Sequence, residues 1–381
     1  MAQRQYLQIP GPTNIPDSVV RAMARQMTNH RGKEFAELLR VCTDGMKQLF
    51  RTEADVLFFP SSGSGGLESA IVNTLSPGDR VLALVCGVFS ERAAMIAESH
   101  GAHVKRLDAE WGQAVDPALV SAELKSDPSI RAVLCCQNET STGVENDIQA
   151  IGRAIGELDH SALLIVDAVS SLALTDLRVD EWNVDVAVTA SQKGLMLPPG
   201  MAVLAVSKNA WAAHEHSSMP RWYWNWKPVK KAQAVGRTAY TPPTALLFGL
   251  EEALRIIFEE GLDNVHARHK RIASAFRRGI RALGLSVLPK EQHASCSVTA
   301  VNLPDGVDGA QLSKRLADDH NVVIGGGLAK LQGRIFRVGH MGQISELDIV
   351  AIMSALELSL SRVGAAVEIN RGVSAIQKHL A

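Results

Sequence analysis

Short apolar runs recur between residues 55 and 206, and each one ends at a polar or glycine-rich segment. The runs lie at residues 56–59, 81–85, 132–136, 162–166, 184–189 and 202–206. Stretches with the spacing of amphipathic helices separate most of them, so strand and helix alternate along the chain. Near-continuous apolar strands that alternate with helices are typical of a mostly parallel sheet buried under helices on both faces. The sequence therefore predicts an α/β fold built on such a sheet.

The C-terminal third has a different pattern. A long amphipathic helix is expected over about residues 262–283, then strands near 285–288, 298–301 and 334–338 with a helix at 309–320. This order predicts a smaller α+β domain, and 381 residues are enough for more than one core. We expect an N-terminal arm near the active site (1–16), a large domain (17–260) and a small C-terminal domain (261–381).

The overall charge excludes several classes of partner. Lys plus Arg number 39 against 40 for Asp plus Glu, so no global field favours nucleic acid or an anionic membrane. Apolar runs are too short to span a membrane, and the first residues are too polar and proline-rich for a signal peptide. The five cysteines are odd in number and lack metal-ligand spacing. We expect a cytoplasmic protein with reduced thiols, no metal, and neither nucleic acid nor membrane as a partner.

An amine and a carboxylate follow two of the predicted strands. Asp167 ends the run at 162–166, and Lys193 comes shortly after the run at 184–189. In a parallel sheet such strand exits share one edge, where ligands bind. A lysine there can form a Schiff base with a carbonyl cofactor, while a carboxylate can hold a protonated ring nitrogen. The alternative is an ordinary surface lysine, but the pairing favours pyridoxal phosphate.

A serine- and glycine-rich turn lies between the strand at 56–59 and a predicted helix. Ser62, Gly63 and Ser64 would let backbone N–H groups and hydroxyls approach an anion at the start of that helix. The turn fits neither the dinucleotide fingerprint nor the nucleotide phosphate loop. Taken alone, it is more often a simple connector than a phosphate site.

Other candidate residues also lie at or near strand ends. Phe89 can lie flat on a cofactor ring and Thr140 can donate a hydrogen bond, although core packing and a turn position are the commoner explanations. Arg337, in a short strand, can bind a substrate carboxylate through two parallel bonds, with a cross-sheet salt bridge as the alternative. His30 and Arg31 form either a solvated turn or a polar loop aimed at the active site.

Several motifs occur together in an order that resembles one family. They are Pro10-Gly11-Pro12-Thr13-Asn14, His30-Arg31, Ser62-Gly63-Ser64-Gly65 with Glu68, Asn138-Glu139-Thr140-Ser141-Thr142-Gly143, Val166-Asp167, Ser191-Gln192-Lys193-Gly194, Tyr240-Thr241-Pro242-Pro243 and Arg337-Val338-Gly339-His340. The chain resembles the class V aminotransferases of fold type I, close to the serine–glyoxylate and alanine–glyoxylate enzymes. The similarity runs almost from end to end.

The resemblance implies a role for each matching residue. Lys193 would bind pyridoxal phosphate covalently and Asp167 would hold its ring nitrogen; the other roles are as follows. Phe89 would stack on the ring and Thr140 would contact the phenolic oxygen. The phosphate would be held by Ser62, Gly63, Ser64 and Gln192, together with Thr241 from a second subunit. The substrate would be contacted by Arg337, Thr140, Gly11, His30 and Arg31. A homodimer with shared active sites follows from the role of Thr241. Two departures weaken the match: Thr238 replaces a phosphate-binding tyrosine, and Leu67 stands where relatives often have an aromatic residue.

The resemblance further implies an activity. We expect transfer of the amino group of a small L-amino acid, with serine first and alanine or aspartate next, to glyoxylate by ping-pong kinetics, giving glycine and a 2-oxo acid. Alternatives are a phosphonate or ureidoglycine aminotransferase, a cysteine desulfurase using Cys296, or a non-catalytic protein that binds the cofactor. The desulfurase is disfavoured because Gln192 occupies the place of a typical histidine before the lysine.

Overall fold

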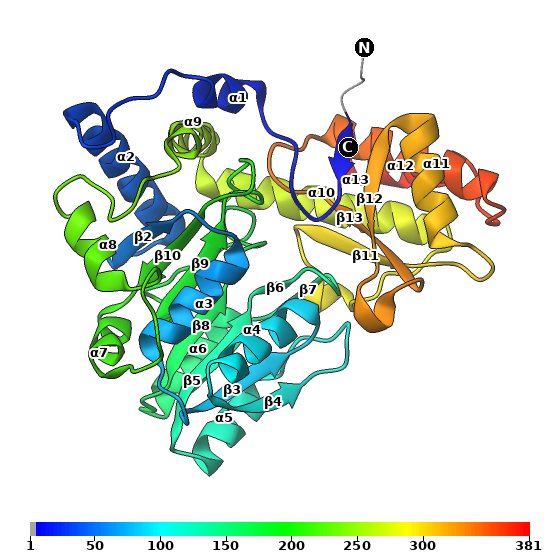
Figure 1. Ribbon diagram of the computed structural model, residues 1–381. Helices are drawn as coiled ribbons and strands as arrows, with labels where there is room; N and C mark the ends of the chain where they lie inside the picture. The colour runs from blue at the N-terminus through cyan, green and yellow to red at the C-terminus, as the bar shows by residue number, and fades with distance from the viewer. Residues whose placement is uncertain (1–4) are drawn as a thin grey trace.

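A computed structural model of the chain describes residues 5–381, and its centre is a sheet of seven strands (Figure 1). In spatial order the strands are β2 (Asp55–Phe59), β10 (Ala202–Val206), β9 (Val186–Ala190), β8 (Leu163–Asp167), β5 (Ile130–Cys136), β3 (Arg80–Val85) and β4 (His103–Asp108). Strand β10 is antiparallel to both neighbours, and the other pairs are parallel. The predicted mostly parallel sheet is confirmed.

The two faces of this sheet are buried by different helices. Successive residues of a strand fall into different hydrophobic clusters: Val56 and Phe58 in one, Leu57 and Phe59 in the other. The first cluster includes helices α2 (Lys33–Phe50), α5 (Pro117–Ser126), α6 (Ile148–Glu157) and α9 (Thr244–Glu260). The second includes α3 (Gly63–Thr74), α4 (Val88–Ser99), α7 (Lys208–His216) and α8 (Trp226–Gln233). Burial on both faces explains why the strands are apolar throughout.

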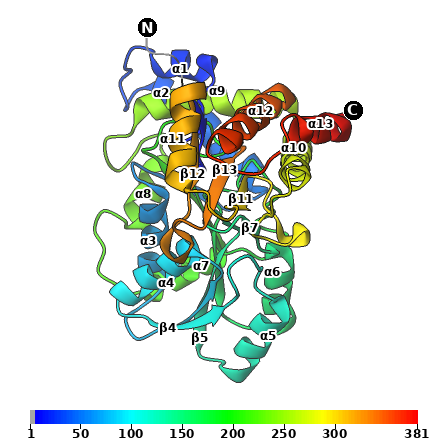
Figure 2. The same cartoon turned by 90° about the vertical axis from the view of Figure 1, so that its right-hand side faces the viewer.

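A second sheet lies beside the first. Its strands, in order, are β1 (Tyr6–Gln8), β12 (Val322–Gly326), β13 (Ile335–Gly339) and β11 (Val298–Asn302). Figure 2 shows this sheet above the β4–β5 side of the larger one. A separate hydrophobic cluster covers it with helices α10 (Leu262–Ala282), α11 (Gly309–His320), α12 (Glu346–Arg362) and α13 (Arg371–Leu380). Helix α1 (Asp17–Met23) packs on α9, and the short strands β6 (Asn138–Glu139) and β7 (Val144–Glu145) form a hairpin.

Two details differ from the sequence-based expectations. The predicted strand at 285–288 is reduced to a single bridge, between Val287 and Val301. Backbone hydrogen bonds on either side of this bridge, from Leu288 to Ala300 and from Asn302 to Ser286, keep the segment alongside β11. The arm expected at 1–16 includes β1, a strand that the sequence did not predict and that pairs in parallel with β12. Residues 1–4 of the predicted arm lie outside the described residues. Within residues 5–381, no helix is long and apolar enough to cross a membrane.

Candidate active site

Most of the predicted site residues lie at one edge of the larger sheet. Strands β2, β3, β5, β8 and β9 run in the same direction, so their C-terminal ends meet there. The residues at these ends are Ser62 to Ser64 after β2, Phe89 after β3, Thr140 after β5, Asp167 at the end of β8, and Gln192 and Lys193 after β9. The edge of a parallel sheet therefore brings together residues up to 131 positions apart in sequence.

Lys193 lies beneath the N-terminal arm. Its Nζ donates a hydrogen bond to the carbonyl oxygen of Pro10, and a Cβ added to Gly11 would lie only 2.5 Å from that Nζ. Gly11 also has a φ of +101°, so a side chain is excluded there by both strain and space. Thr13 fixes the arm further, because its N–H donates to the Gln192 carbonyl at 3.2 Å. The arm thus closes over the lysine.

Burial shifts the acid–base properties of this lysine. Desolvation lowers the pKa of Lys193 to about 8, against the opposing effect of the Asp167 charge, and the Arg337 charge lowers it further. A lower pKa increases the fraction of neutral amine near pH 7. A neutral amine is the form that can act as a nucleophile or accept a proton.

Asp167 is buried at the end of β8. Its Oδ1 accepts a hydrogen bond from the Val169 N–H at 2.9 Å. Desolvation raises the pKa of Asp167 to about 6, and the nearby Glu139 charge raises it too, while the Lys193 charge opposes the shift. A buried carboxylate with a raised pKa is suited to a cationic partner, which would return that pKa to its ordinary range.

The predicted phosphate turn forms the start of helix α3. Ser62 is the N-cap, and its side chain accepts a hydrogen bond from the Gly65 N–H at 3.4 Å. A Cβ on Gly63 would lie 2.6 Å from a Val169 methyl carbon, so glycine lets α3 lie against the loop after Asp167. The first N–H groups of a helix have no intrahelical acceptor and carry partial positive charge. This turn can hold an anion close to Asp167.

Glu139 lies in β6 beside the start of α4, and the sequence predicts no role for it. It is fully buried, and its carboxylate accepts hydrogen bonds from the N–H groups of Phe89 and Ser90 at the start of α4. The Ser90 and Ser141 hydroxyls also donate to it. The carboxylate thereby holds the helix that carries Phe89 against β6. The only sequence signal was its place in the quoted Asn138–Gly143 motif, since neither spacing nor periodicity predicts so distant a partner.

Arg337 faces the Thr140 segment from β13 of the smaller sheet. Its Nε donates to the Gly326 carbonyl at 2.8 Å and its Nη1 to the Thr140 carbonyl at 3.1 Å. Among residues 5–381 it pairs with no carboxylate, so the expected alternative of a cross-sheet salt bridge is wrong. Desolvation lowers the pKa of Arg337 to about 10, which leaves it cationic at neutral pH. The Thr140 hydroxyl hydrogen-bonds to the Ser170 hydroxyl at 2.6 Å.

Three predicted residues are not joined to this edge by contacts within the chain. His30 lies in the loop before α2 and packs edge-on against Phe35 of that helix. The backbone N–H of the exposed Arg31 donates to the Asn29 side chain. Thr241 is exposed next to Tyr240, whose ring stacks on Tyr223. Their proposed contacts with cofactor and substrate stay predictions.

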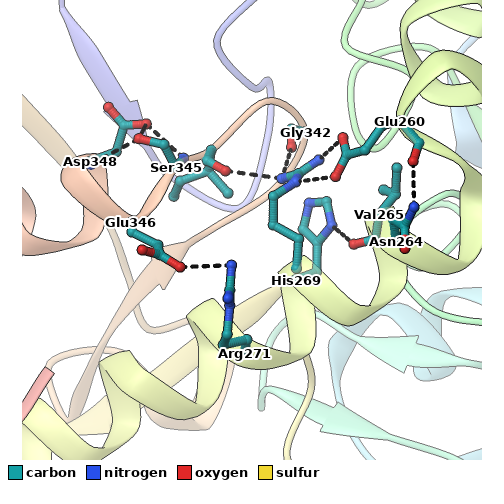
Figure 3. Close-up of polar contacts among 11 residues, drawn as sticks. Glu260, Asn264, Val265, His269, Arg271, Gly342, Ser345, Glu346 and Asp348 are labelled. Carbon is teal, nitrogen blue, oxygen red and sulfur yellow. Dashed lines mark hydrogen bonds and ion pairs between the residues drawn. The ribbon is translucent and has the colours of Figure 1, made fainter. Parts of the chain in front are cut away.

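A second polar cluster lies where α9, α10 and the loop after β13 meet (Figure 3). Arg268 on α10 donates through Nε and Nη2 to both carboxylate oxygens of Glu260 at the end of α9. Its Nη1 donates to the carbonyl oxygens of Gly342 and Ile344 in the loop after β13. A cavity of about 550 Å³ lies here, lined also by Gly194 next to the lysine. The cluster thus joins α9, α10 and the loop after β13 beside a cavity that reaches the residue next to Lys193.

Comparisons with known proteins agree with this geometry. The sequence model of the aminotransferase class-V family matches residues 5–344. The chain is 41% identical to serine–glyoxylate aminotransferase of Methylorubrum extorquens, covering 99% of this chain and 96% of that protein. It is 39% identical to L-aspartate–glyoxylate aminotransferase of Paracoccus denitrificans, covering 100% and 97%. The crystal structure of ureidoglycine–glyoxylate aminotransferase from Bacillus subtilis superposes with a TM-score of 0.95 at 27% identity, covering 100% and 99%. The chain therefore belongs to the class V aminotransferases, whose cofactor is pyridoxal phosphate, and the resemblance found in its sequence is confirmed.

Proposed function

We propose that this protein transfers the amino group of a small L-amino acid to glyoxylate, giving glycine and a 2-oxo acid, with serine favoured as donor over alanine and aspartate. The observation that carries the proposal is the buried amine of Lys193, which interacts electrostatically with Asp167 under the N-terminal arm. Glyoxylate as the acceptor is supported by three similar proteins, because the name of each of them includes glyoxylate. The 41% identity to a serine–glyoxylate enzyme supports the donor.

The residues at the sheet edge fit pyridoxal phosphate. Ser62, Gly63 and Ser64 begin a helix that can hold the phosphate, and Asp167 can bind the ring nitrogen. The Gln192 side-chain oxygen is buried and has no hydrogen-bond partner among the described residues. A buried polar atom without a partner costs free energy unless a ligand satisfies it. The site is therefore better suited to a bound polar ligand than to none.

The chain's own residues divide the chemistry among them. When bound, the cofactor supplies a carbonyl for the donor's amino group and a ring that withdraws electrons. Lys193 would attach the cofactor, and its released Nζ would then take the α proton of the donor and deliver it to the former carbonyl carbon of the cofactor, on the other side of the transferred nitrogen. Asp167 would keep the ring nitrogen protonated. Phe89 would pack on the ring, held in place through its N–H bond to Glu139.

Arg337 would serve both half-reactions. Its Nη2 has no hydrogen-bond partner among residues 5–381, while Nε and Nη1 are fixed by backbone carbonyls. The amino-acid donor and the 2-oxo acid acceptor each carry one carboxylate beside the reacting carbon, so a single fixed guanidinium suits both. Gly11 would border the same pocket, since any larger residue would collide with Lys193.

The alternatives within the family differ in what they require. A cysteine desulfurase needs a mobile reactive thiol, but the Cys296 thiol donates to the Leu174 carbonyl at 3.2 Å and burial raises its pKa. A ureidoglycine aminotransferase shares the glyoxylate acceptor and is distinguished only by its donor. A protein that binds the cofactor without catalysis would not need the low pKa of Lys193.

The direct test follows the cofactor's absorbance in single half-reactions. Serine, alanine, aspartate and ureidoglycine are each added to the purified holoenzyme without acceptor, and conversion to the pyridoxamine form is timed. We expect serine to react fastest and glyoxylate to restore the original spectrum. Lys193→Ala should abolish turnover and covalent attachment after borohydride reduction. Lys125→Ala, which changes an exposed lysine on α5, is the matched control and should behave as wild type.

Two results would contradict the proposal. One is a holoenzyme whose spectrum no amino acid changes, and the other is a pyridoxamine form that glyoxylate fails to reoxidise while another 2-oxo acid succeeds. If ureidoglycine reacts much faster than serine, the alternative donor is correct.

We also propose a homodimer with shared active sites. Thr241, His30 and Arg31 match family motifs, but no hydrogen bond or ring contact joins them to their own chain's Lys193 edge among the described residues. All three belong to loops with a partly or fully exposed surface, which a second subunit could cover. In such a dimer each subunit would complete the other's site.

Domain division and location are proposed on physical grounds. The separate hydrophobic clusters of the two sheets support an arm (1–16), a large domain (17–260) and a small domain (261–381). The five free cysteines support a reducing compartment such as the cytoplasm.

A further inference from the structure

Arg92 contacts two of the groups proposed to hold the cofactor. It lies on α4, three residues after Phe89, so both side chains share one face of the helix. The Arg92 Nη1 donates a hydrogen bond to the Ser64 hydroxyl at 3.1 Å. Its guanidinium carbon also lies 4.9 Å from the centre of the Phe89 ring. One side chain therefore joins the proposed phosphate turn to the proposed ring platform.

The positive charge of Arg92 forms no ion pair with the carboxylates of its own helix or of α3. Helices α3 and α4 carry three acidic residues, Glu68, Glu91 and Glu98. Glu68 pairs with His100, and the other two pair with Arg106. Among the residues that the structure describes, no carboxylate forms an ion pair with Arg92. The cation is therefore available to an anionic ligand.

The hydrogen bond to Ser64 also orients that hydroxyl. Because the Ser64 oxygen accepts from Arg92, its own hydrogen points elsewhere and needs an acceptor. Among residues 5–381 the Ser64 hydroxyl donates no hydrogen bond, so it is free to donate to a ligand. Ser64 lies in the first turn of α3, where the backbone N–H groups also point outward. A phosphate oxygen at this point would accept from both the hydroxyl and the backbone.

The charge of Arg92 reaches the rest of the site. It lowers the pKa of Asp167, although less than burial raises it. Arg92 thus acts electrostatically on the same edge of the sheet as Lys193 and the phosphate turn.

We propose that Arg92 is a phosphate-positioning residue, which fixes the Ser64 hydroxyl and adds a positive charge at the start of α3. This inference rests on the proposed assignment of that turn to the cofactor's phosphate. Arg92 is a positioning residue, since it acts on the phosphate through Ser64 and through its charge.

The test separates the phosphate from the ring. Apoenzyme is prepared from wild type, Arg92→Gln, Arg92→Lys and the control Arg153→Gln, which changes an exposed arginine on α6. Dissociation constants are measured for pyridoxal phosphate and for pyridoxal, which lacks the phosphate. We expect Arg92→Gln to weaken pyridoxal phosphate about tenfold, the effect of one charge-assisted contact, and to leave pyridoxal within about twofold. Arg92→Lys should recover most of the loss because it keeps the charge.

Each other outcome overturns the inference in a recognisable way. If Arg92→Gln weakens both ligands equally, Arg92 only supports the Phe89 platform. If it binds both as Arg153→Gln does, Arg92 has no role in holding the cofactor. If wild-type protein itself takes up no pyridoxal phosphate on Lys193, the proposed function fails and this inference fails with it. Melting temperatures of all four proteins verify that they are folded.

Discussion

Asp167 shows the conflict between folding and chemistry at the scale of one residue. Its carboxylate is buried with a single backbone donor, and desolvation raises its pKa from 3.8 to about 6. A native-state pKa above the unfolded value means that the folded protein binds more protons between these pH values. The favourable contribution of protonated Asp167 to the free energy of unfolding is therefore lost as the pH rises from about 4 to about 6. The proposed contact with the cofactor's ring nitrogen would explain why the site keeps this destabilised carboxylate.

Replacing Asp167 should therefore stabilise the apoenzyme while abolishing activity. Asn keeps the acceptor for the Val169 N–H and removes the buried charge. We expect Asp167→Asn to raise the free energy of unfolding at pH 7 by on the order of 2 kcal/mol, with the gain vanishing below about pH 4. Urea denaturation of apoenzyme across this range measures it. Asp108→Asn, an exposed aspartate at the end of β4, should show no such pH dependence. A variant less stable than wild type at pH 7 would contradict the pKa argument.

At the scale of elements, the junction of α9, α10 and the loop after β13 depends on one arginine. Arg268 binds Glu260 through two parallel hydrogen bonds and also satisfies two backbone carbonyls, with its side chain only 21% exposed. Arg271, one turn further along α10, makes a simple ion pair with Glu346 at 2.7 Å and is 54% exposed (Figure 3). Bidentate pairing and carbonyl contacts should make the first far more important than the second.

The two arginines form a matched pair of variants. Arg268→Gln should cost about 2 kcal/mol of unfolding free energy, because it leaves a partly buried carboxylate and two carbonyls without a donor. Arg271→Gln should cost less than about 0.5 kcal/mol. Because the Gly342–Ile344 loop follows the strand of Arg337, the first change should also raise KM for both substrates more than it lowers kcat. Equal effects of the two substitutions would show that Arg268 is only a surface ion pair.

At the scale of the whole molecule, the question is whether one chain suffices for an active site. Lys193, Asp167 and Arg337 lie close together within one chain, whereas Thr241 is exposed and forms no hydrogen bond with any of the three among residues 5–381. The proposed dimer places the partner's copy of this loop at each phosphate. Sharing can be tested by separating the two contributions into different chains.

Mixed dimers provide that test. Lys193→Ala and Thr241→Glu are each expected to be inactive, the second because a carboxylate would repel the phosphate. Mixing and reassociating equal amounts should restore about a quarter of wild-type activity, since half of the dimers are mixed and each has one site with neither change. If Thr241 served its own chain's site, every site would carry one lesion and mixing would restore nothing. Sedimentation analysis verifies that mixed dimers form.

Much of the fold follows from local patterns. Apolar runs of strand length alternating with helices predict a parallel sheet, because each run must be buried on both faces. The same pattern places Asp167 and Lys193 at one edge, since parallel strands end on the same side. The position of the Ser62–Ser64 turn at the start of a helix could be predicted for the same reason, because it depends only on a strand and a helix that adjoin the turn in sequence. The strand predicted at 285–288 is shortened to a single bridge beside β11, because a short apolar run alone does not decide how many of its residues pair with a neighbouring strand.

The remaining features depend on contacts between distant segments. Glu139 reaches α4 about fifty residues away, Pro10 covers Lys193, and Arg268 joins two helices to a loop after β13. No periodicity encodes such pairings, because each forms only when the chain has folded. The pKa values of Lys193 and Asp167 belong to this group as well, since desolvation arises from all the atoms that surround a charge. Local sequence thus determined which residues stand at the sheet edge, and the tertiary structure alone decided how that edge is closed, charged and held.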